Sequence, residues 1–324
     1  MLHLGYALLI LLTFTATVML EGRLIPRLRK NAAQPIYEEG PSWHLSKSGT
    51  PTMGGLGFLL PILLIGLACA LATFFFGESY FARSLLITLS YAALNSLIGV
   101  IDDTAKIKKR ENAGLSPLEK LLLQGGAAAL FLISRTLLLG NGTSIHFGFG
   151  EVDLGIFYYP LVFVMLLGTV NCANLTDGID GLASGVTLAV FTALGALAFN
   201  SNGEVSVISA LAIGGAAGFL TVNLHPARIF MGDTGSLFLG SLAAGACVAL
   251  GNPLIILSVG FVYLFEGISV ILQVTVYKLT KKRVFKMAPY HHHLEKCGWN
   301  ENKIVIWAII VTLLSSLLGI YLFG

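Results

Sequence analysis

Two adjacent carboxylates, Asp102 and Asp103, are followed one helical turn later by Lys106. They lie where a long apolar segment ends, and neighbouring carboxylates with little water around them repel each other. A divalent cation or a basic partner would relieve that repulsion, which makes the group a candidate for metal or phosphate chemistry. A charged, solvated end of a membrane helix explains the same residues equally well. This motif alone leaves both interpretations open.

A second polar cluster holds Asn171, Asn174, Asp177 and Asp180 within ten residues, beside glycines that let a ligand approach the backbone. The two asparagines share a helix face, because they are one turn apart. Four oxygen-bearing side chains so close together suit a hard cation or a ribose–phosphate group. The alternative is a polar turn in which Asp180 caps the next helix. That alternative does not explain both asparagines, so a binding site is favoured.

A third cluster runs from Asn223 through Phe230 to Asp233, which stands at the start of another apolar segment. Free backbone N–H groups at a helix start attract anions. A phosphate bridged to Mg²⁺ would therefore suit Asp233 and that helix end together. A simple N-cap role for Asp233 explains the motif as well.

A fourth cluster is the run His291, His292 and His293, which lies in a basic segment. Histidine-rich tracts often bind metal, but consecutive histidines point in different directions and the HExxH spacing is absent. Contact with phosphate is therefore favoured over zinc. Glu266, in the middle of an apolar segment, is either a site residue or a structural hydrogen-bond partner of a neighbouring helix.

Long apolar segments must position these clusters. Of the 324 residues, 55% are hydrophobic and 11% are charged, whereas soluble domains carry about 25% charged residues. A membrane-crossing helix needs about 20 apolar residues. The ten apolar segments lie near residues 2–22, 53–75, 84–101, 117–138, 156–173, 182–199, 205–222, 235–250, 253–277 and 304–323. The sequence predicts an all-α polytopic protein with ten transmembrane helices, forming one integral-membrane unit over residues 1–324.

Several local signals refine this plan. The first segment lacks the basic flank and cleavage site of a signal peptide, so we expect a retained helix. Ser116–Glu119 is a capping box, and Asn252–Pro253 opens the ninth segment as a helix start. Residues 140–155 alternate apolar and polar side chains around a Gly–Glu turn, which predicts a small β-hairpin.

Lysine and arginine predict the orientation, because they concentrate in cytoplasmic loops. All 20 except Arg83 and Arg135 fall in or beside the loops that follow the first, third, seventh and ninth segments. These loops are therefore predicted to be cytoplasmic. Both termini and the β-hairpin would then be periplasmic, and all the polar clusters would share the cytoplasmic face.

The four clusters, in this order, resemble those of the polyprenyl-phosphate N-acetylhexosamine-1-phosphate transferases, and the resemblance covers essentially the whole chain. The motifs Asp102–Lys106, Asn171–Leu182 and Gly232–Ser236 are typical of that superfamily. The stretches Lys47–Gly55 and Pro289–Glu295 favour its phospho-N-acetylmuramoyl-pentapeptide transferase branch.

The resemblance implies a specific reaction at the bacterial inner membrane. The substrates would be UDP-N-acetylmuramoyl-pentapeptide and undecaprenyl phosphate, the products lipid I and UMP, the cofactor Mg²⁺, and the assembly a homodimer. It implies metal ligation by Asp233 with Asn174, and catalytic roles for Asp102, Asp103, Lys106, Asp233 and His291. The implied substrate-binding residues are Lys47, Thr52, Asn171, Asn174, Asp177, Asp180, Asn223, Phe230, His292 and His293, with Lys47, Asp177 and Phe230 near the uridine.

Phosphoryl transfer requires charge neutralisation and in-line placement more than covalent chemistry. We expect one step, in which Asp102 or Asp103 removes the last proton of the lipid phosphate. The alternative is a two-step route with Asp233 as covalent nucleophile. Two other activities are considered, a sister transferase for N-acetylglucosamine-1-phosphate and a transporter, which the lack of a sequence repeat disfavours. Segment 253–277 is long enough to tilt or break and to form a groove for the acceptor's tail.

Overall fold

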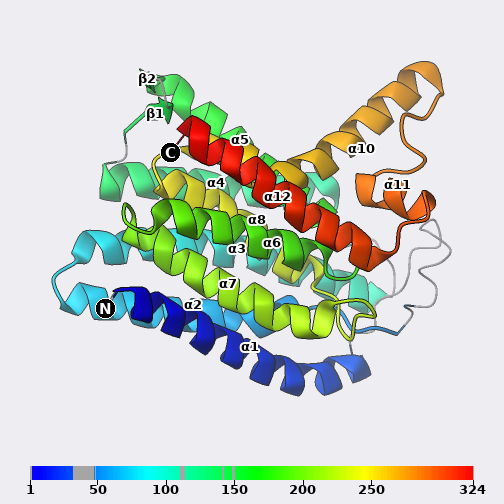
Figure 1. Ribbon diagram of the computed structural model, residues 1–324, viewed down its shortest axis with the longest axis horizontal. Helices are drawn as coiled ribbons and strands as arrows, with labels where there is room; N and C mark the ends of the chain where they lie inside the picture. Colours follow the sequence, from blue (N-terminus) through cyan, green and yellow to red (C-terminus); the bar gives the residue numbers. More distant parts are fainter. Residues whose placement is uncertain are drawn as a thin grey trace.

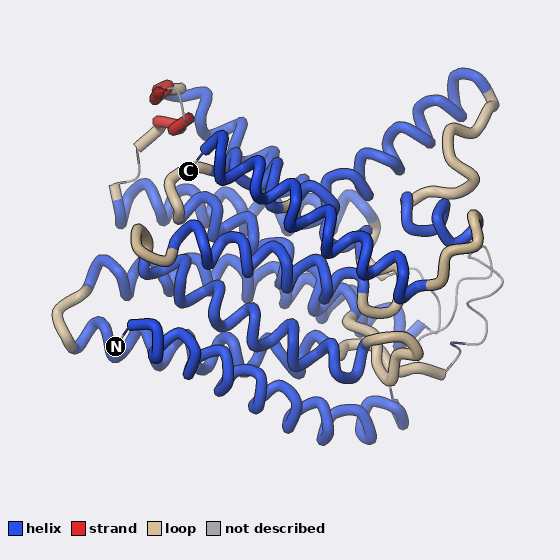
Figure 2. The backbone as a smooth tube through the Cα atoms, viewed as in Figure 1, coloured by secondary structure: helices blue, strands red, loops and turns tan. Residues whose placement is uncertain are grey.

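The computed structural model describes residues 2–31, 47, 49–109, 114–140, 142–147 and 150–323. The described chain is a bundle of helices with one small hairpin, as Figures 1 and 2 show. The longer helices are α1 (Leu2–Asn31), α2 (Gly55–Phe75), α3 (Ser79–Lys109), α4 (Pro117–Leu139), α5 (Tyr158–Thr176), α6 (Leu182–Ala198), α7 (Gly203–Asn223), α8 (Gly232–Ala249), α10 (Phe261–Thr280) and α12 (Glu301–Phe323). The short helices are η2 (Gly155–Phe157), η3 (Pro253–Ile255), α9 (Ile256–Val259) and α11 (Tyr290–Lys296).

The predicted apolar segments are helical. Within the described residues, eight helices are long and apolar enough to cross a membrane, namely α1, α2, α3, α4, α5, α7, α10 and α12. Helix α6 is apolar but has only 17 residues. Helix α8 has 18 residues, nearly all of them buried, and contacts α3, α5, α2, α6 and α7. It is therefore the central helix of the bundle, around which the site-bearing helices pack (Figure 1).

The ninth segment breaks, as its length predicted. The 3₁₀ turn η3 leads into the four-residue α9, which ends at Val259. Gly260 follows, and α10 begins at Phe261. Figure 1 shows α10 leaning away from the rest of the bundle, and α11 packs against its first half, where His291 contacts Glu266. Side chains such as Ile271 and Leu279 are 67% and 80% exposed on α10. The break therefore leaves an apolar helix face uncovered by protein.

Helix starts confirm two local predictions and overturn two others. The Ser116 side chain accepts from Glu119 N–H while the Glu119 carboxylate accepts from Ser116 N–H, and Asn252 caps its turn through Leu254 N–H. In contrast, the interpretation of Asp180 and Asp233 as simple caps is wrong. The N-cap residues of α6 and α8 are Gly181 and Met231, and neither helix has a side-chain cap bond. Both aspartates instead contact residues that are distant in the sequence.

Glycines bring three helices together at the start of α8. A Cβ at Gly55 would lie 2.4 Å from the Gly235 Cα, and one at Gly99 would lie 2.3 Å from the Asp233 carbonyl oxygen. Any larger residue at these two positions would push α2 or α3 away from α8. This close approach holds Asp233 beside the end of α3.

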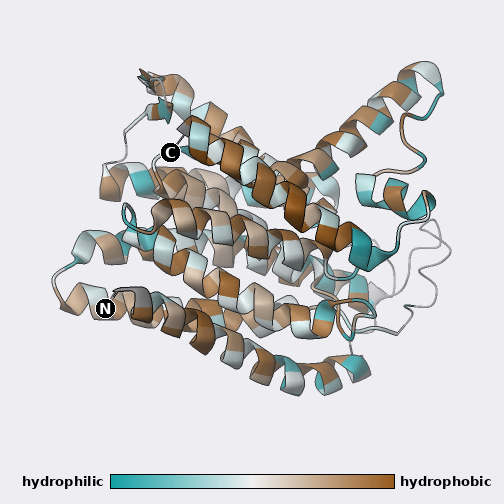
Figure 3. Ribbon diagram, viewed as in Figure 1, coloured by the Kyte–Doolittle hydropathy of each residue, from teal (hydrophilic) through white to brown (hydrophobic). Residues whose placement is uncertain are grey.

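Polar residues collect at one end of the bundle. Figure 3 shows hydrophilic colour concentrated where the site-bearing loops meet α11 and the start of α12, whereas outer helices expose apolar side chains such as Leu64 and Leu137. The predicted hairpin forms at the opposite end (Figure 1), where β1 (Ser144–Phe147) pairs antiparallel with β2 (Gly150–Asp153). Phe149, part of the predicted alternation, lies outside the described residues. The predicted Gly–Glu turn is wrong, because Gly150 and Glu151 lie in β2.

Candidate active site

Three carboxylates from two helices converge at the polar end of the bundle. Oxygens of Asp102, Asp103 and Asp233 lie within 4.8 Å of one another. The first two stand near the end of α3, and Asp233 stands in the first turn of α8. Residues 130 positions apart thus form one cluster, because α3 and α8 pack closely at Gly99.

Asp103 ties α3 to the start of α8. Its carboxylate accepts hydrogen bonds from Asp233 N–H at 3.1 Å, Thr234 N–H at 2.9 Å and the Thr234 hydroxyl at 2.7 Å. These donors include backbone N–H groups of the first helical turn, which have no partner inside the helix. Asp103 therefore satisfies the helix start and fixes the position of Asp233.

Two ammonium groups and one amide surround Asp233. Its Oδ2 lies 3.1 Å from Lys106 Nζ and 2.7 Å from Lys120 Nζ, while its Oδ1 accepts from the Asn174 amide at 2.9 Å. Lys106 also contacts Asp102 at 2.6 Å, and Lys120 donates to Asn174 Oδ1 at 3.1 Å. Basic groups held this way beside carboxylates suit a site that receives further negative charge, such as a phosphate.

Asp177 adds a fourth carboxylate. Among the described residues its side chain has no hydrogen-bond partner. Burial, together with the negative charges of Asp233 and Asp103, raises the pKa of the Asp177 carboxyl well above its usual range. The raised pKa favours the neutral form of Asp177.

The carboxylate cluster fits a divalent cation. Its donors are the oxygens of Asp102, Asp103 and Asp233 with the Asn174 amide oxygen nearby, and Mg²⁺ prefers such hard ligands. The three carboxylates of the cluster outnumber the two ammonium groups of Lys106 and Lys120. The donor set therefore suits the magnesium ion that the sequence predicts.

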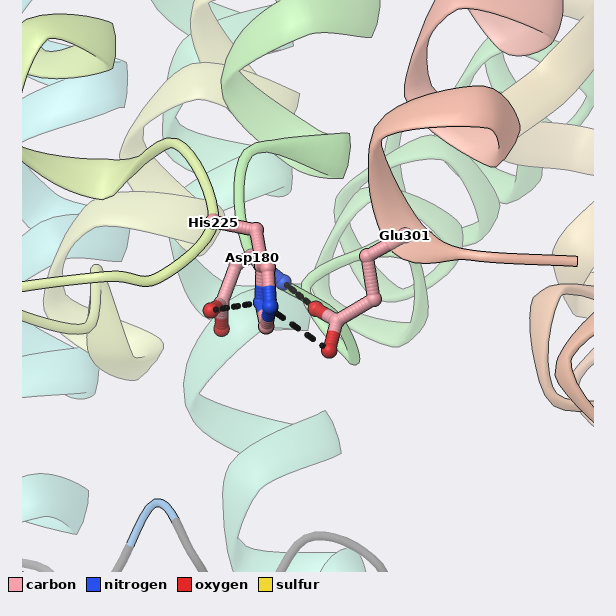
Figure 4. A group of neighbouring side chains, drawn as sticks. All are labelled: Asp180, His225 and Glu301. Atoms are coloured by element: carbon pink, nitrogen blue, oxygen red, sulfur yellow. Dashed lines mark hydrogen bonds and ion pairs between the residues drawn. The ribbon is translucent and has the colours of Figure 1, made fainter.

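A second group of ionisable side chains surrounds Lys47. Its Nζ lies 2.7 Å from both Asp180 Oδ1 and Glu301 Oε2. His225 Nδ1 lies 3.0 Å from Asp180 and 3.3 Å from Glu301, and Figure 4 shows the side chains of Asp180, His225 and Glu301 converging from two loops and the start of α12. An ammonium group already holds both carboxylates, and one donor is a ring nitrogen. This group therefore fits Mg²⁺ less well than the carboxylate cluster does.

The three histidines of α11 have three different environments. His291 is fully buried; its backbone N–H and Nδ1 lie 3.2 and 3.1 Å from Glu266 Oε2. Its Nε2 faces the loop between α5 and α6, since a Cβ at Gly178 would lie 2.2 Å from that nitrogen. His292 contacts Glu295 at 2.6 Å, and His293 accepts from the backbone of the loop before α11. The rings of His291 and His292 touch, with centroids 4.2 Å apart, but the three side chains bind three different partners.

The remaining predicted residues occupy positions around these groups. Asn223 binds Gly181 N–H, the Ser184 hydroxyl and a backbone carbonyl, so it braces the turn that carries Asp180. Asn171 donates to Gln124 rather than to a residue of the carboxylate cluster. Thr52 is buried near Gly232 and Asp103. Phe230 is partly buried and pairs through its backbone with Pro51 and Gly54.

Comparison with known proteins identifies the family. The model for Glycosyl transferase family 4 matches residues 85–251, and a signature of phospho-N-acetylmuramoyl-pentapeptide-transferases matches residues 47–59. A protein of that name from Halalkalibacterium halodurans is 42% identical over 97% of this chain and 96% of its own length. The chain belongs to the phospho-N-acetylmuramoyl-pentapeptide-transferase family.

Other members of this family agree along their whole length. The phospho-N-acetylmuramoyl-pentapeptide-transferase of Desulfitobacterium hafniense is 41% identical over 95% of both chains. That of Caldicellulosiruptor bescii is 40% identical over 99% of this chain and 98% of its own. The resemblance inferred from the sequence motifs is confirmed, and the chain is a transferase of the bacterial membrane.

Three residues of these charged groups, Lys120, His225 and Glu301, were not predicted as site residues from the sequence. Lys120 follows the Ser116 capping box by one turn, and its basic charge at a predicted cytoplasmic helix end was the available signal. His225 stands between the Asn223 and Phe230 positions already singled out. Glu301 gave no local signal, because its contact with Lys47 spans 254 positions.

Proposed function

We propose that this transferase moves phospho-N-acetylmuramoyl-pentapeptide from UDP to undecaprenyl phosphate, giving lipid I and UMP for peptidoglycan synthesis. The names of its relatives support the substrates. The observation that carries the proposal is the environment of Asp233, where two lysines and three further carboxylates meet at the polar end of an apolar bundle. Such a site suits transfer between two phosphates, one of which is anchored in lipid.

The proposed reaction is one displacement at phosphorus. An oxygen of the lipid phosphate attacks the phosphorus next to the sugar, the bond from that phosphorus to the UMP oxygen breaks, and UMP leaves. Asp233 and Asn174 would hold Mg²⁺, which supplies charge neutralisation at the pyrophosphate. Lys106 and Lys120, which both contact Asp233, would stabilise the phosphate oxygens that are not bound to the metal.

Asp102 is the better candidate to accept the proton of the lipid phosphate. Asp103 already accepts from three donors, so its role is to position Asp233. Asp233 in turn is held by two ammonium groups and an amide. A carboxylate held in this way that also serves as a metal ligand is a poor nucleophile, which supports the one-step route over a covalent intermediate on Asp233.

The remaining substrate contacts are assigned as the family resemblance implies. Lys47, Asp177 and Phe230 would lie near the uridine, with Asp180, Asn171 and Asn223 as further substrate-binding residues. Thr52 would face the phosphates, and His291, His292 and His293 the sugar-phosphate side. The acceptor's tail would lie along the exposed apolar face of α10, which the break at Gly260 directs away from the bundle.

We further propose ten membrane spans in one unit over residues 1–324, with α6 and α8 crossing as inner helices. The lysine and arginine distribution supports a cytoplasmic active site and two periplasmic termini. The family resemblance supports a homodimer.

The proposal is tested by following UMP release from the purified protein with undecaprenyl phosphate and one of two donors. We expect release with UDP-N-acetylmuramoyl-pentapeptide, and none with UDP-N-acetylglucosamine. The opposite preference would assign the chain to the sister activity. Loss of release in Asp233→Ala, with normal release in a variant of the exposed Asp153, would tie the reaction to this site.

A further inference from the structure

A pocket of about 280 Å³ opens between α11 and the start of α12. It lies next to the Lys47 group, with which it shares two residues. Its lining consists of His225, Glu295, Lys296, Trp299, Asn300 and Glu301. A pocket that mixes charged, amide and aromatic side chains suits a polar ligand with some apolar surface.

The two acidic residues of the pocket are already engaged. Glu301 holds Lys47 at 2.7 Å and accepts from Asp180 N–H, and Glu295 lies 2.6 Å from His292 Nδ1. Both carboxylates therefore have partners on the side of the proposed donor site.

The basic residues around the pocket are not matched in this way. Lys296 is exposed at the pocket, Lys303 Nζ lies 4.1 Å from the centre of the Trp299 ring, and Lys286 Nζ donates to the Lys296 carbonyl at 3.2 Å. Within the described part of the chain, none of these three ammonium groups has a carboxylate partner. Lys296 therefore offers an ammonium group at the pocket to an anion.

The pocket also lies within reach of the proposed sugar position. Lys296 is four residues beyond His292 on α11, which is about 6 Å along a helix. An extended pentapeptide spans about 17 Å. A peptide attached to a sugar near His292 can therefore cross the pocket.

We propose that this pocket binds the peptide carried by the donor, with Lys296 pairing with a carboxylate of that peptide and Trp299 and Asn300 contacting its backbone. This assignment rests on the proposed function and names the part of the donor that distinguishes it from simpler UDP-sugars. A lipid phosphate offers similar anionic chemistry, but the pocket adjoins the Lys47 group and carries an amide and a ring. These features favour a peptide.

The test compares two donors on the full-length protein in detergent: UDP-N-acetylmuramoyl-pentapeptide, and the same donor with its peptide carboxylates converted to carboxamides. For the wild type, KM of the amidated donor should be about three- to tenfold higher, the range for one partly exposed charge-assisted contact. In Lys296→Met, KM of the normal donor should rise by a similar factor, while KM of the amidated donor and kcat stay unchanged. Lys296→Arg should restore the preference, and Lys278→Met, at an exposed lysine of α10, should not alter it.

Three results would overturn the assignment. Equal KM values for the two donors in the wild type would show that the protein does not contact a peptide carboxylate. A Lys296→Met effect of the same size on both donors would place Lys296 elsewhere in binding. An effect on KM of undecaprenyl phosphate, or one that depends on anionic lipid, would assign the lysine to the membrane. Absence of any UMP release by the wild type would instead refute the proposed function, which keeps the two failures distinguishable.

Discussion

The pair formed by Glu266 and His291 provides a quantitative prediction about how α11 is held. Both side chains are almost fully buried, and one carboxylate oxygen accepts from the His291 backbone N–H and from Nδ1. In Glu266→Ala both donors lose their partner. Each buried unsatisfied group costs about 1–3 kcal/mol, so the docking of α11 on α10 is weakened by about 2–6 kcal/mol.

The isosteric variant Glu266→Gln should have a smaller effect. Its amide oxygen still accepts, but a charged acceptor is about twice as strong as a neutral one. A loss of about 1–2 kcal/mol corresponds to about a five- to thirtyfold decrease. We therefore expect kcat/KM to fall at least about thirtyfold in Glu266→Ala and less in Glu266→Gln.

The assay is UMP release at varied donor concentration, with thermal unfolding measured in the same detergent. Because α11 has only seven residues, the unfolding temperature should change little in either variant. Glu78→Ala, at an exposed carboxylate between α2 and α3, serves as the control. If Glu266→Ala retained kcat/KM within twofold of the wild type, the conclusion that Glu266 positions His291 would be wrong.

Three further changes give separate tests. Gly178→Ala should reduce kcat about tenfold or more, because the new Cβ would lie 2.2 Å from Nε2 of the buried His291; an unchanged kcat would contradict the packing. Lys120→Met should lower kcat about ten- to hundredfold at saturating substrates, since it removes a 2.7 Å contact to Asp233; equal activity would show that the lysine is dispensable. The raised pKa of Asp177 penalises the folded state increasingly as pH rises above the ordinary aspartate range of about 4. Asp177→Asn should therefore raise the unfolding temperature of the metal-free protein at pH 7.5, with a gain that shrinks toward pH 4, while lowering transfer activity. A constant gain across that range would refute the electrostatic explanation.

Features that depend only on residues close together in the sequence could be predicted. The capping box at Ser116, the turn start at Asn252 and the hairpin at residues 144–153 all appear in the structure. Each depends on side chains within a few positions of one another, and apolar length identifies a helix in the same local way. The break near Gly260 was expected from length alone, whereas its position depends on how α9 and α10 pack.

Contacts between distant segments could not be predicted this way. The sequence motifs indicated that Asp102 and Asp233 belong to a site, but their shared cluster depends on the close packing of α3 and α8. Lys120 and Glu301 join the site only through folding. The cap interpretation of Asp233 failed for the same reason, because a local pattern does not reveal a partner 113 positions away.

The central claim is transfer of a phospho-sugar rather than of a sugar. It is tested most directly with UDP-N-acetylmuramoyl-pentapeptide carrying ³²P in the phosphate next to the sugar, incubated with the purified protein, undecaprenyl phosphate and Mg²⁺. Attack at that phosphorus predicts that the label enters the lipid fraction while unlabelled UMP is released in equal amount. Attack at the sugar carbon would leave the label in UDP. Label recovered in UDP would contradict the proposed reaction and the role assigned to Asp233 and its two lysines.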